Sequence, residues 1–284
     1  MALSPLMKQY MEIKQEHPEC ILMCRIGDFY EMFFEDAKTA SKELDLVLTG
    51  KDCGLEERAP MCGVPYHAVE GYIAKLVSRG YRVAICEQLE DPATAKGLVK
   101  RDVIRIITPG TVTEGGYLDE KKNNYICALC PDAGCVGLAF ADVSTGDVLA
   151  GEIIGEDLTA RIVSEAAAYT PSELIAPPEL PEDISTAFRN RFGTLVSQSE
   201  SADFTFENAR CALERVYGKI PEAASDTAVR AVGALIAYIE RTQKTDLKYL
   251  KEVDFYSCDE FMGIDAASRR NLEIAEAMRV KQRK

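Results

Sequence analysis

The sequence lacks a hydrophobic run long enough to cross a membrane. Its longest apolar stretch, "AVGALIAYI" at residues 231–239, is far shorter than the roughly 20 residues that a spanning helix needs. No basic segment followed by an apolar one opens the chain, so the sequence predicts no export signal. We therefore expect a cytoplasmic protein without a membrane partner.

Histidine is also scarce, and this argues against a zinc site. The only histidines are His17 and His67, while Cys127, Cys130 and Cys135 lie far from both in the sequence. A structural zinc site usually takes a second CxxC pair or nearby histidines, and neither follows here. Without an export signal, the ten cysteines are expected to be free thiols inside apolar segments.

A phosphate-binding loop is missing as well. The only Gly-Lys pairs, at Gly50 and Gly218, do not follow a glycine-rich loop. Such a loop is needed to surround nucleotide phosphates with backbone N–H groups. We expect no ATP hydrolysis, no cofactor and no catalytic residue in this chain.

The acidic charge is unevenly distributed. The formal net charge is −13, of which residues 1–110 carry −3 and residues 111–284 carry −10. Residues 71–109 hold seven Lys or Arg against four acidic residues. A nucleic-acid site needs a local basic patch rather than a basic protein, so only the first part offers such a surface. Ordinary solvated charge explains the same residues equally well.

The first 110 residues alternate helical and strand patterns. "SPLMKQYMEIKQEHP" predicts a helix with Ser4 as N-cap and Pro5 at its first position, and "CILMCRI" predicts a buried strand. A second amphipathic helix is predicted in "YHAVEGYIAKLVSRG", followed by strands in "YRVAICEQL" and "DVIRIITPGT". The glycine-rich, polar residues 108–124 are interpreted as a linker.

The stretch "RIGDFYEMFF" brings several aromatic residues around a Gly-Asp pair. Its spacing predicts a strand, a turn at Gly27 and a helix that begins with a capping box between Asp28 and Glu31. Phe29 then has two interpretations. It is either a core aromatic, or a side chain that the turn presents to stack on a base or to enter a base step.

The second part predicts another α/β domain. Three strand patterns in "YICALC", "GCVGLAFADV" and "GDVLAGEI" form a meander, and helices and short strands alternate after it. Asp142 ends the second of these strands, with Asp147 and Glu152 nearby. Converging carboxylates of this kind can hold the metal ions of a nuclease. However, aspartate and serine are also ordinary turn residues, so both interpretations stay open.

Three stretches together resemble a known family. They are "RIGDFYEMFFEDAKTASKELDLVLT", "PMCGVPYHAVEGYIAKLVSRGYRVAICEQLEDPATAKGLVKRDVIRIITPGT" and "GIDAASRRNLEI", and they closely resemble the MutS family of bacterial DNA mismatch repair proteins. The resemblance implies a mismatch-recognition domain at residues 1–112 and a ribonuclease H-like connector domain at residues 120–250. Residues 251–284 would be the truncated start of a helical lever domain. The family's ATPase, with its ATP, magnesium and main dimer interface, would lie beyond residue 284.

The same resemblance implies roles for individual residues. The family's Phe-x-Glu motif matches Phe29-Tyr30-Glu31, so Phe29 is expected to stack on a mispaired base from the minor groove and Glu31 to hydrogen-bond to that base. Met61 matches a position that the family places near the mismatch.

Four cations are candidate phosphate contacts, with solvated surface charge as the alternative: Lys51, Lys75, Arg79 and Arg82. The implied partners are double-stranded DNA with mismatches or small unpaired loops, the MutL protein at the connector, and a second copy in the full-length protein. The resemblance thus predicts a DNA-binding protein, and the alternative from the residues is a divalent-metal nuclease around Asp142.

Overall fold

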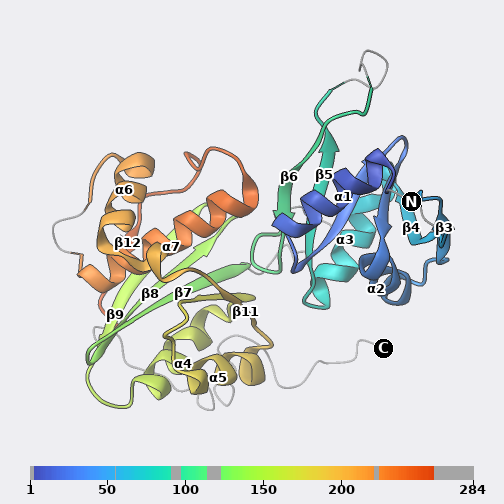
Figure 1. The fold of residues 1–284 in the computed structure, drawn as a ribbon. Helices are drawn as coiled ribbons and strands as arrows, with labels where there is room; N and C mark the ends of the chain where they lie inside the picture. Colours follow the sequence, from blue (N-terminus) through green and yellow to red (C-terminus); the bar gives the residue numbers. More distant parts are fainter. Residues whose placement is uncertain (1–2, 55, 91–96, 114–122, 221–223, 259–284) are drawn as a thin grey trace, which may run out of the picture. The chain divides into compact units, whose positions relative to one another are not determined.

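The computed structural model describes residues 3–54, 56–90, 97–113, 123–220 and 224–258. It has two units, each built around one mixed six-stranded sheet (Figure 1). Residues 1–120 and 239–245 belong to the first unit, and residues 121–238 and 246–284 to the second. The predicted two-domain α/β fold is confirmed. The predicted lever segment falls mostly outside the described residues, and the boundaries proposed for the three domains stay predictions.

The first sheet has the strand order β3-β4-β2-β1-β5-β6. β1 pairs in parallel with β5, and all other neighbours are antiparallel. The strands are β1 (Cys20–Ile26), β2 (Phe29–Phe33), β3 (Thr49–Lys51), β4 (Ala59–Pro65), β5 (Arg82–Gln88) and β6 (Arg101–Ile107).

Helices cover both faces of this sheet. α1 (Pro5–Glu16) packs on one face through Met7 and Tyr10, and α2 (Phe34–Leu44) and α3 (Val69–Ser78) pack on the other. A short 3-10 helix, η1 (Tyr66–Ala68), precedes α3. The predicted start of α1 is confirmed, because the Ser4 hydroxyl accepts a hydrogen bond from the Met7 N–H at 3.4 Å.

The prediction of a helix that begins at Asp28 is wrong. Residues 29–33 form strand β2, and the helix begins only at Phe34. The aromatic spacing fits a helix and a strand equally well over so short a window. Pairing with β1 on one side and β4 on the other decides for the strand, because each pairing satisfies backbone groups that a helix start would leave open. Strands β3 and β4 were not predicted either.

The second sheet has the order β11-β10-β7-β8-β9-β12. β7, β8 and β9 form the predicted antiparallel meander, and β10 and β11 follow in parallel on the β7 side. This is the strand arrangement of a ribonuclease H-like domain, which confirms that expectation. The strands are β7 (Tyr125–Asp132), β8 (Cys135–Asp142), β9 (Asp147–Ile154), β10 (Glu173–Ala176), β11 (Leu195–Gln198) and β12 (Asp254–Phe255).

Two helix pairs flank the second sheet (Figure 1). α4 (Leu158–Tyr169) and α5 (Glu182–Phe192) bury Ile162 and Phe188 in one apolar core. On the opposite face, the start of α7 (Asp226–Gln243) approaches β8 so closely that a Cβ at Gly137 would lie 2.1 Å from the Thr227 carbonyl oxygen. Only glycine fits at this contact. η2 (Ser201–Phe204) and α6 (Phe206–Tyr217) precede α7.

The predicted linker at residues 108–124 begins later than expected. Val112 is buried in the core of the first unit. The Thr108 N–H donates to the Thr111 hydroxyl at 3.0 Å, and both threonines are buried. Residues 114–122 lie outside the described residues. Among the described residues, no helix is long and apolar enough to span a bilayer.

Candidate nucleic-acid interface

The hairpin between β1 and β2 presents Phe29 at its tip. Gly27 occupies the left-handed region with φ of +60°, which a side chain would strain. Asp28 completes the turn, and Phe29 then pairs with Ile26 on one side and Pro65 on the other. Its side chain is 47% exposed, whereas that of Phe33 is 1% exposed. The core interpretation of Phe29 is therefore wrong.

The alternation of strand β2 explains the contrast between its two phenylalanines. Side chains at positions 29, 31 and 33 share one face, and Tyr30 and Met32 point to the other, where both are buried. Phe33 packs under α1 against Tyr10, with ring centroids 4.9 Å apart. Phe29 lies beyond that core. Phe29 and Glu31 thus stand on the same face at the open end of the strand.

Glu31 forms an ion pair with Lys51 of the edge strand β3. The two side chains are 15% and 29% exposed, respectively, so the pair is partly shielded from water. The Lys51 ammonium also lies 5.5 Å from the centroid of the Phe33 ring. The structure thus brings together two predicted site residues that are 20 positions apart in the sequence.

Met61 lies on β4, the strand next to β2. It pairs with Phe33 of β2 and with Thr49 of β3, whose hydroxyl donates to the Met61 carbonyl at 3.1 Å. Its side chain is half-buried and packs on the core beneath α1. Strand register therefore places Met61 four residues along β2 from Phe29.

Of the other predicted cations, Arg82 lies away from Phe29. Arg82 pairs with Cys20 at the start of β1, while Phe29 pairs with Ile26 at its end. Six residues of extended chain between them span about 20 Å. Arg82 is bound to Glu19 with an N–O distance of 3.4 Å.

Arg79 and Lys75 lie near the end of α3. Arg79 binds the Glu43 carboxylate at 2.5 Å. The Lys75 ammonium lies 5.9 Å from the Tyr72 ring centroid.

Two residues that contact the turn before Phe29 were not identified from the sequence. The Arg25 guanidinium carbon lies 3.8 Å from the centroid of the Tyr66 ring, and Tyr66 is 44% exposed. Tyr66 follows Pro65, the β4 partner of Phe29. The arginine next to the turn glycine in "RIGD" was the available signal, but its partner is about 40 residues away, and no local pattern predicts that contact.

Two family models match the chain. Residues 4–116 match the family model for MutS domain I, and residues 124–251 match the model for MutS domain II. The chain belongs to the MutS family. The resemblance found in the sequence is thereby confirmed.

Curated relatives match along the whole chain. The DNA mismatch repair protein MutS of Ruminiclostridium cellulolyticum is 49% identical over 286 residues, which cover 99% of this chain and 33% of that protein. MutS of Acetivibrio thermocellus is 49% identical over 287 residues, with 100% and 33% covered. MutS of Clostridium novyi is 46% identical over 285 residues, with 100% and 31% covered. The chain spans about a third of the length of these MutS relatives.

In the part that matches MutS domain II, Asp142 accepts hydrogen bonds from backbone N–H groups. The fully buried carboxylate accepts hydrogen bonds from the Asn124 N–H at 3.1 Å, the Ser144 N–H at 2.9 Å and the Ser144 hydroxyl at 2.6 Å. Asp147 binds Lys251 at 2.7 Å, and Glu152 accepts from the Thr227 hydroxyl. These carboxylates close turns and pair with neighbours instead of converging.

The described residues contain no group of three or more His, Cys, Asp or Glu side chains placed to hold a metal ion. Cys127 and Cys130 lie three positions apart on β7, so they point to opposite faces of the sheet. Burial raises the pKa of the Cys127 thiol well above its ordinary value and that of Cys130 to about 11. Both thiols are therefore held in the neutral form, which binds metals poorly.

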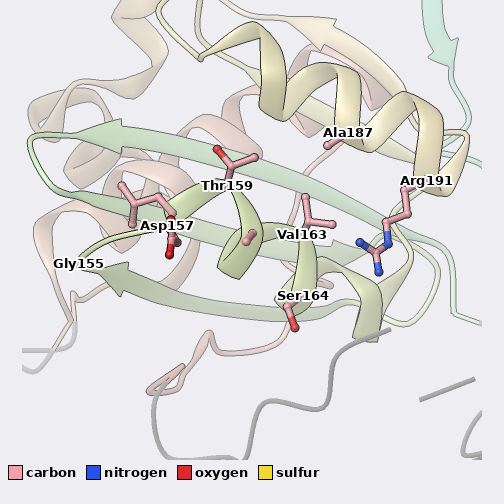
Figure 2. A pocket seen from close by; sticks show the side chains of 9 residues that line it. Gly155, Asp157, Thr159, Val163, Ser164, Ala187 and Arg191 are labelled. Atoms are coloured by element: carbon pink, nitrogen blue, oxygen red, sulfur yellow. The ribbon is translucent and has the colours of Figure 1, made fainter. Parts of the chain in front are cut away.

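A hollow of about 770 Å³ lies between α4 and α5 (Figure 2). Its lining combines the apolar Val163 and Ala187 with Asp157 and Arg191. Thr159, at its rim, donates to the Asp183 carboxylate at 2.8 Å. The hollow is wide open and brings together no nucleophile and base, so we assign it no chemistry.

Proposed function

We propose that the first unit detects mismatched or unpaired bases in double-stranded DNA by inserting Phe29 from the minor groove. The observation that carries this proposal is the exposure of Phe29 at the hairpin tip, on the same strand face as buried Phe33. A folded chain that exposes one phenylalanine and buries the next one on that face leaves the first available for a ligand. The match to MutS domain I supports DNA as that ligand.

The energetics of stacking favour damaged pairing over intact duplex. Stacking a base on an aromatic ring contributes about 1–3 kcal/mol. Unstacking a base step costs about a few kcal/mol, and less where pairing is already weakened. One phenylalanine therefore cannot open a sound duplex but can enter a mismatch. Selectivity then comes from how easily the DNA deforms, and no base code is read.

Glu31 is proposed to hydrogen-bond to the mispaired base. A carboxylate close to DNA repels the phosphates, so its presence lowers affinity for perfect duplex unless a base donates to it. In the free protein Lys51 neutralises this charge. On DNA, Lys51 is proposed to turn toward a phosphate, which frees Glu31 for the base. Met61 is proposed to line the same end of the site.

Lys75, Arg79 and Arg82 are proposed as phosphate contacts at a distance from Phe29. Arg79 and Arg82 would have to exchange Glu43 and Glu19 for DNA phosphates. That exchange makes each contribution small, because both exposed ion pairs and exposed phosphate contacts are screened by salt.

The second unit is proposed to dock a protein partner. Its acidic charge makes it a poor surface for a polyanion, and Asp142, Asp147 and Glu152 are bonded within the fold. We propose MutL as this partner. We also propose that the unit passes the mismatch signal to an ATP- and magnesium-binding region of the full-length protein, which acts as a cytoplasmic homodimer. No observation favours a nuclease around Asp142.

Titration of matched and mismatched duplexes at one fixed salt concentration tests the proposal. Binding is measured for the 284-residue chain and for a chimera in which it replaces the matched third of the Ruminiclostridium cellulolyticum MutS protein. Phe29→Ala should remove the preference for mismatched DNA and keep weak binding to phosphates. Glu31→Ala should instead strengthen binding to perfect duplex. Unchanged discrimination by Phe29→Ala in the chimera would reject the proposal.

A further inference from the structure

We propose that Arg25 and Tyr66 form a clamp that holds the Gly27–Asp28 turn and thereby sets the direction of Phe29. This inference rests on the proposed function, because it assigns the two residues a role in presenting the wedge. Neither residue is part of the Phe-x-Glu motif, and both would act through Phe29 as positioning residues.

Arg25 holds the first residue of the turn. Its Nε atom donates to the Gly27 carbonyl at 2.5 Å. Its guanidinium carbon lies 3.8 Å from the Tyr66 ring centroid and 5.7 Å from that of Tyr30. The flat guanidinium is therefore stacked on one aromatic ring and close to a second, an arrangement that a lysine ammonium cannot reproduce.

Tyr66 holds the second residue of the turn. Its backbone N–H donates to the Asp28 carbonyl at 3.0 Å. The carbonyls of both turn residues are thus fixed by one two-residue stack, and Phe29 follows directly in the chain. The Arg25 carbonyl is itself held by Arg101, whose Nε donates to it at 3.0 Å. The clamp is therefore anchored to strand β6 of the same sheet.

The surroundings of Arg25 argue against a role as a free phosphate contact. Its side chain is 21% exposed, and one terminal nitrogen lies 4.0 Å from the Glu87 carboxylate. Glu87 also accepts a hydrogen bond from the Tyr30 hydroxyl. The charge of Arg25 is thus balanced within the fold. Its contribution to the turn is the hydrogen bond to Gly27 and the contact with the Tyr66 ring. A rigid wedge binds better than a mobile one, because less freedom is lost when it enters the DNA.

Variants in the chimera separate positioning from phosphate binding. Arg25→Lys keeps the charge but loses the stack, and Tyr66→Ala removes the ring. Each should lower mismatch-over-match discrimination by about fivefold, as expected when a wedge must be ordered on binding. Affinity for matched duplex and its salt dependence should stay within about twofold of wild type. Tyr66→Phe keeps the ring and should match wild type, and Phe29→Ala is the reference for complete loss.

A second measurement needs no DNA. Hydrogen exchange of the Tyr66 amide in the 284-residue chain reports directly on its bond to the Asp28 carbonyl. Arg25→Lys should speed this exchange by about tenfold or more while the core amides of β1 keep their protection. Exchange as slow as in wild type would overturn the clamp.

The DNA titrations provide two further ways to overturn the clamp. Full discrimination in both Arg25→Lys and Tyr66→Ala would reject it. So would a drop in matched-duplex affinity for Arg25→Met, rescued by Arg25→Lys, with a salt slope reduced by about one, since that is the signature of a phosphate contact. If Phe29→Ala keeps full discrimination, the proposed function fails, and the amide exchange still decides whether the clamp holds the turn.

Discussion

Each unit contains a hairpin, and the two hairpins differ in the burial of a residue at or next to the turn. Between β1 and β2, the turn at residues 27–28 accepts hydrogen bonds from Arg25 and from the Tyr66 N–H, and Phe29 is 47% exposed. Between β8 and β9, the turn at residues 143–146 is closed by Asp142, whose carboxylate is fully buried and bonded to backbone donors. A hairpin whose tip side chain is left exposed is therefore the better candidate for function. A polar residue whose hydrogen bonds are all satisfied within the fold serves stability.

The largest expected effect contrasts two phenylalanines of one strand. Phe33→Ala should lower the free energy of unfolding by about 3–5 kcal/mol, because it empties a packed site beneath α1. Phe29→Ala should cost less than about 1 kcal/mol, because its side chain is half-exposed and leaves no cavity. Urea unfolding of the 284-residue chain measures both. Comparable losses of unfolding free energy for the two variants would contradict the contrast between exposed Phe29 and buried Phe33.

Asp142→Ala tests the closed hairpin. Removing this buried acceptor leaves several backbone and hydroxyl donors unsatisfied, so the free energy of unfolding should fall by about 3 kcal/mol. Asp147→Asn is the matched control in the same turn and should cost less than about 1 kcal/mol, because its ion pair is exposed. Incubation of wild type with labelled DNA and Mg²⁺ or Mn²⁺ should give no cleavage. Cleavage that Asp142→Asn abolishes would instead restore the nuclease.

A double-mutant cycle on Glu31 and Lys51 sharpens the comparison within the first unit. Glu31→Gln, Lys51→Met and the double variant should give a coupling of about 1 kcal/mol in the free energy of unfolding, because the pair is partly shielded from solvent. The cycle is measured by urea unfolding. A coupling that is indistinguishable from zero would mean that Lys51 does not neutralise Glu31 in the free protein.

The smallest effect concerns pH and the exposed pair of the second unit. Hydrogen bonds from Lys251 and Thr145 lower the pKa of Asp147. A lowered pKa in the folded state contributes stability above the unfolded pKa, and this contribution is lost as pH falls through the folded pKa. Lys251→Met should raise the pKa of Asp147 toward its ordinary value, as carboxylate chemical shifts from an NMR titration would report. An unchanged titration would show that Lys251 has no influence on this carboxylate.

Sequence reasoning predicted the elements whose signals are local. The helix cap at Ser4, the strand at residues 20–26 and the meander of the second unit depend on neighbouring residues, and all three are confirmed. The strand at residues 29–33 was mistaken for a helix, because its pairing partners come from β1 and β4 and only long-range pairing fixes its conformation.

In the candidate site, too, the local motif was predicted and the long-range contacts were not. The Phe-x-Glu motif identified Phe29 and Glu31 as candidates, and strand alternation explains why both share one face. The ion pair of Glu31 with Lys51 and the stack of Arg25 on Tyr66 were not predicted. Both contacts join segments that meet only when the sheet forms, so no window of sequence contains them.

Photocrosslinking from position 29 tests the central claim most directly. Phe29 is replaced by p-benzoylphenylalanine in the chimera, and a second sample carries the same group at Ile104, another exposed apolar position of the first unit. We predict crosslinks from position 29 that map to the mispaired base and its neighbours and that are largely lost on perfect duplex, with few crosslinks from position 104. Crosslinks from position 29 that spread evenly over matched and mismatched duplex, or that equal those from position 104, would contradict the account.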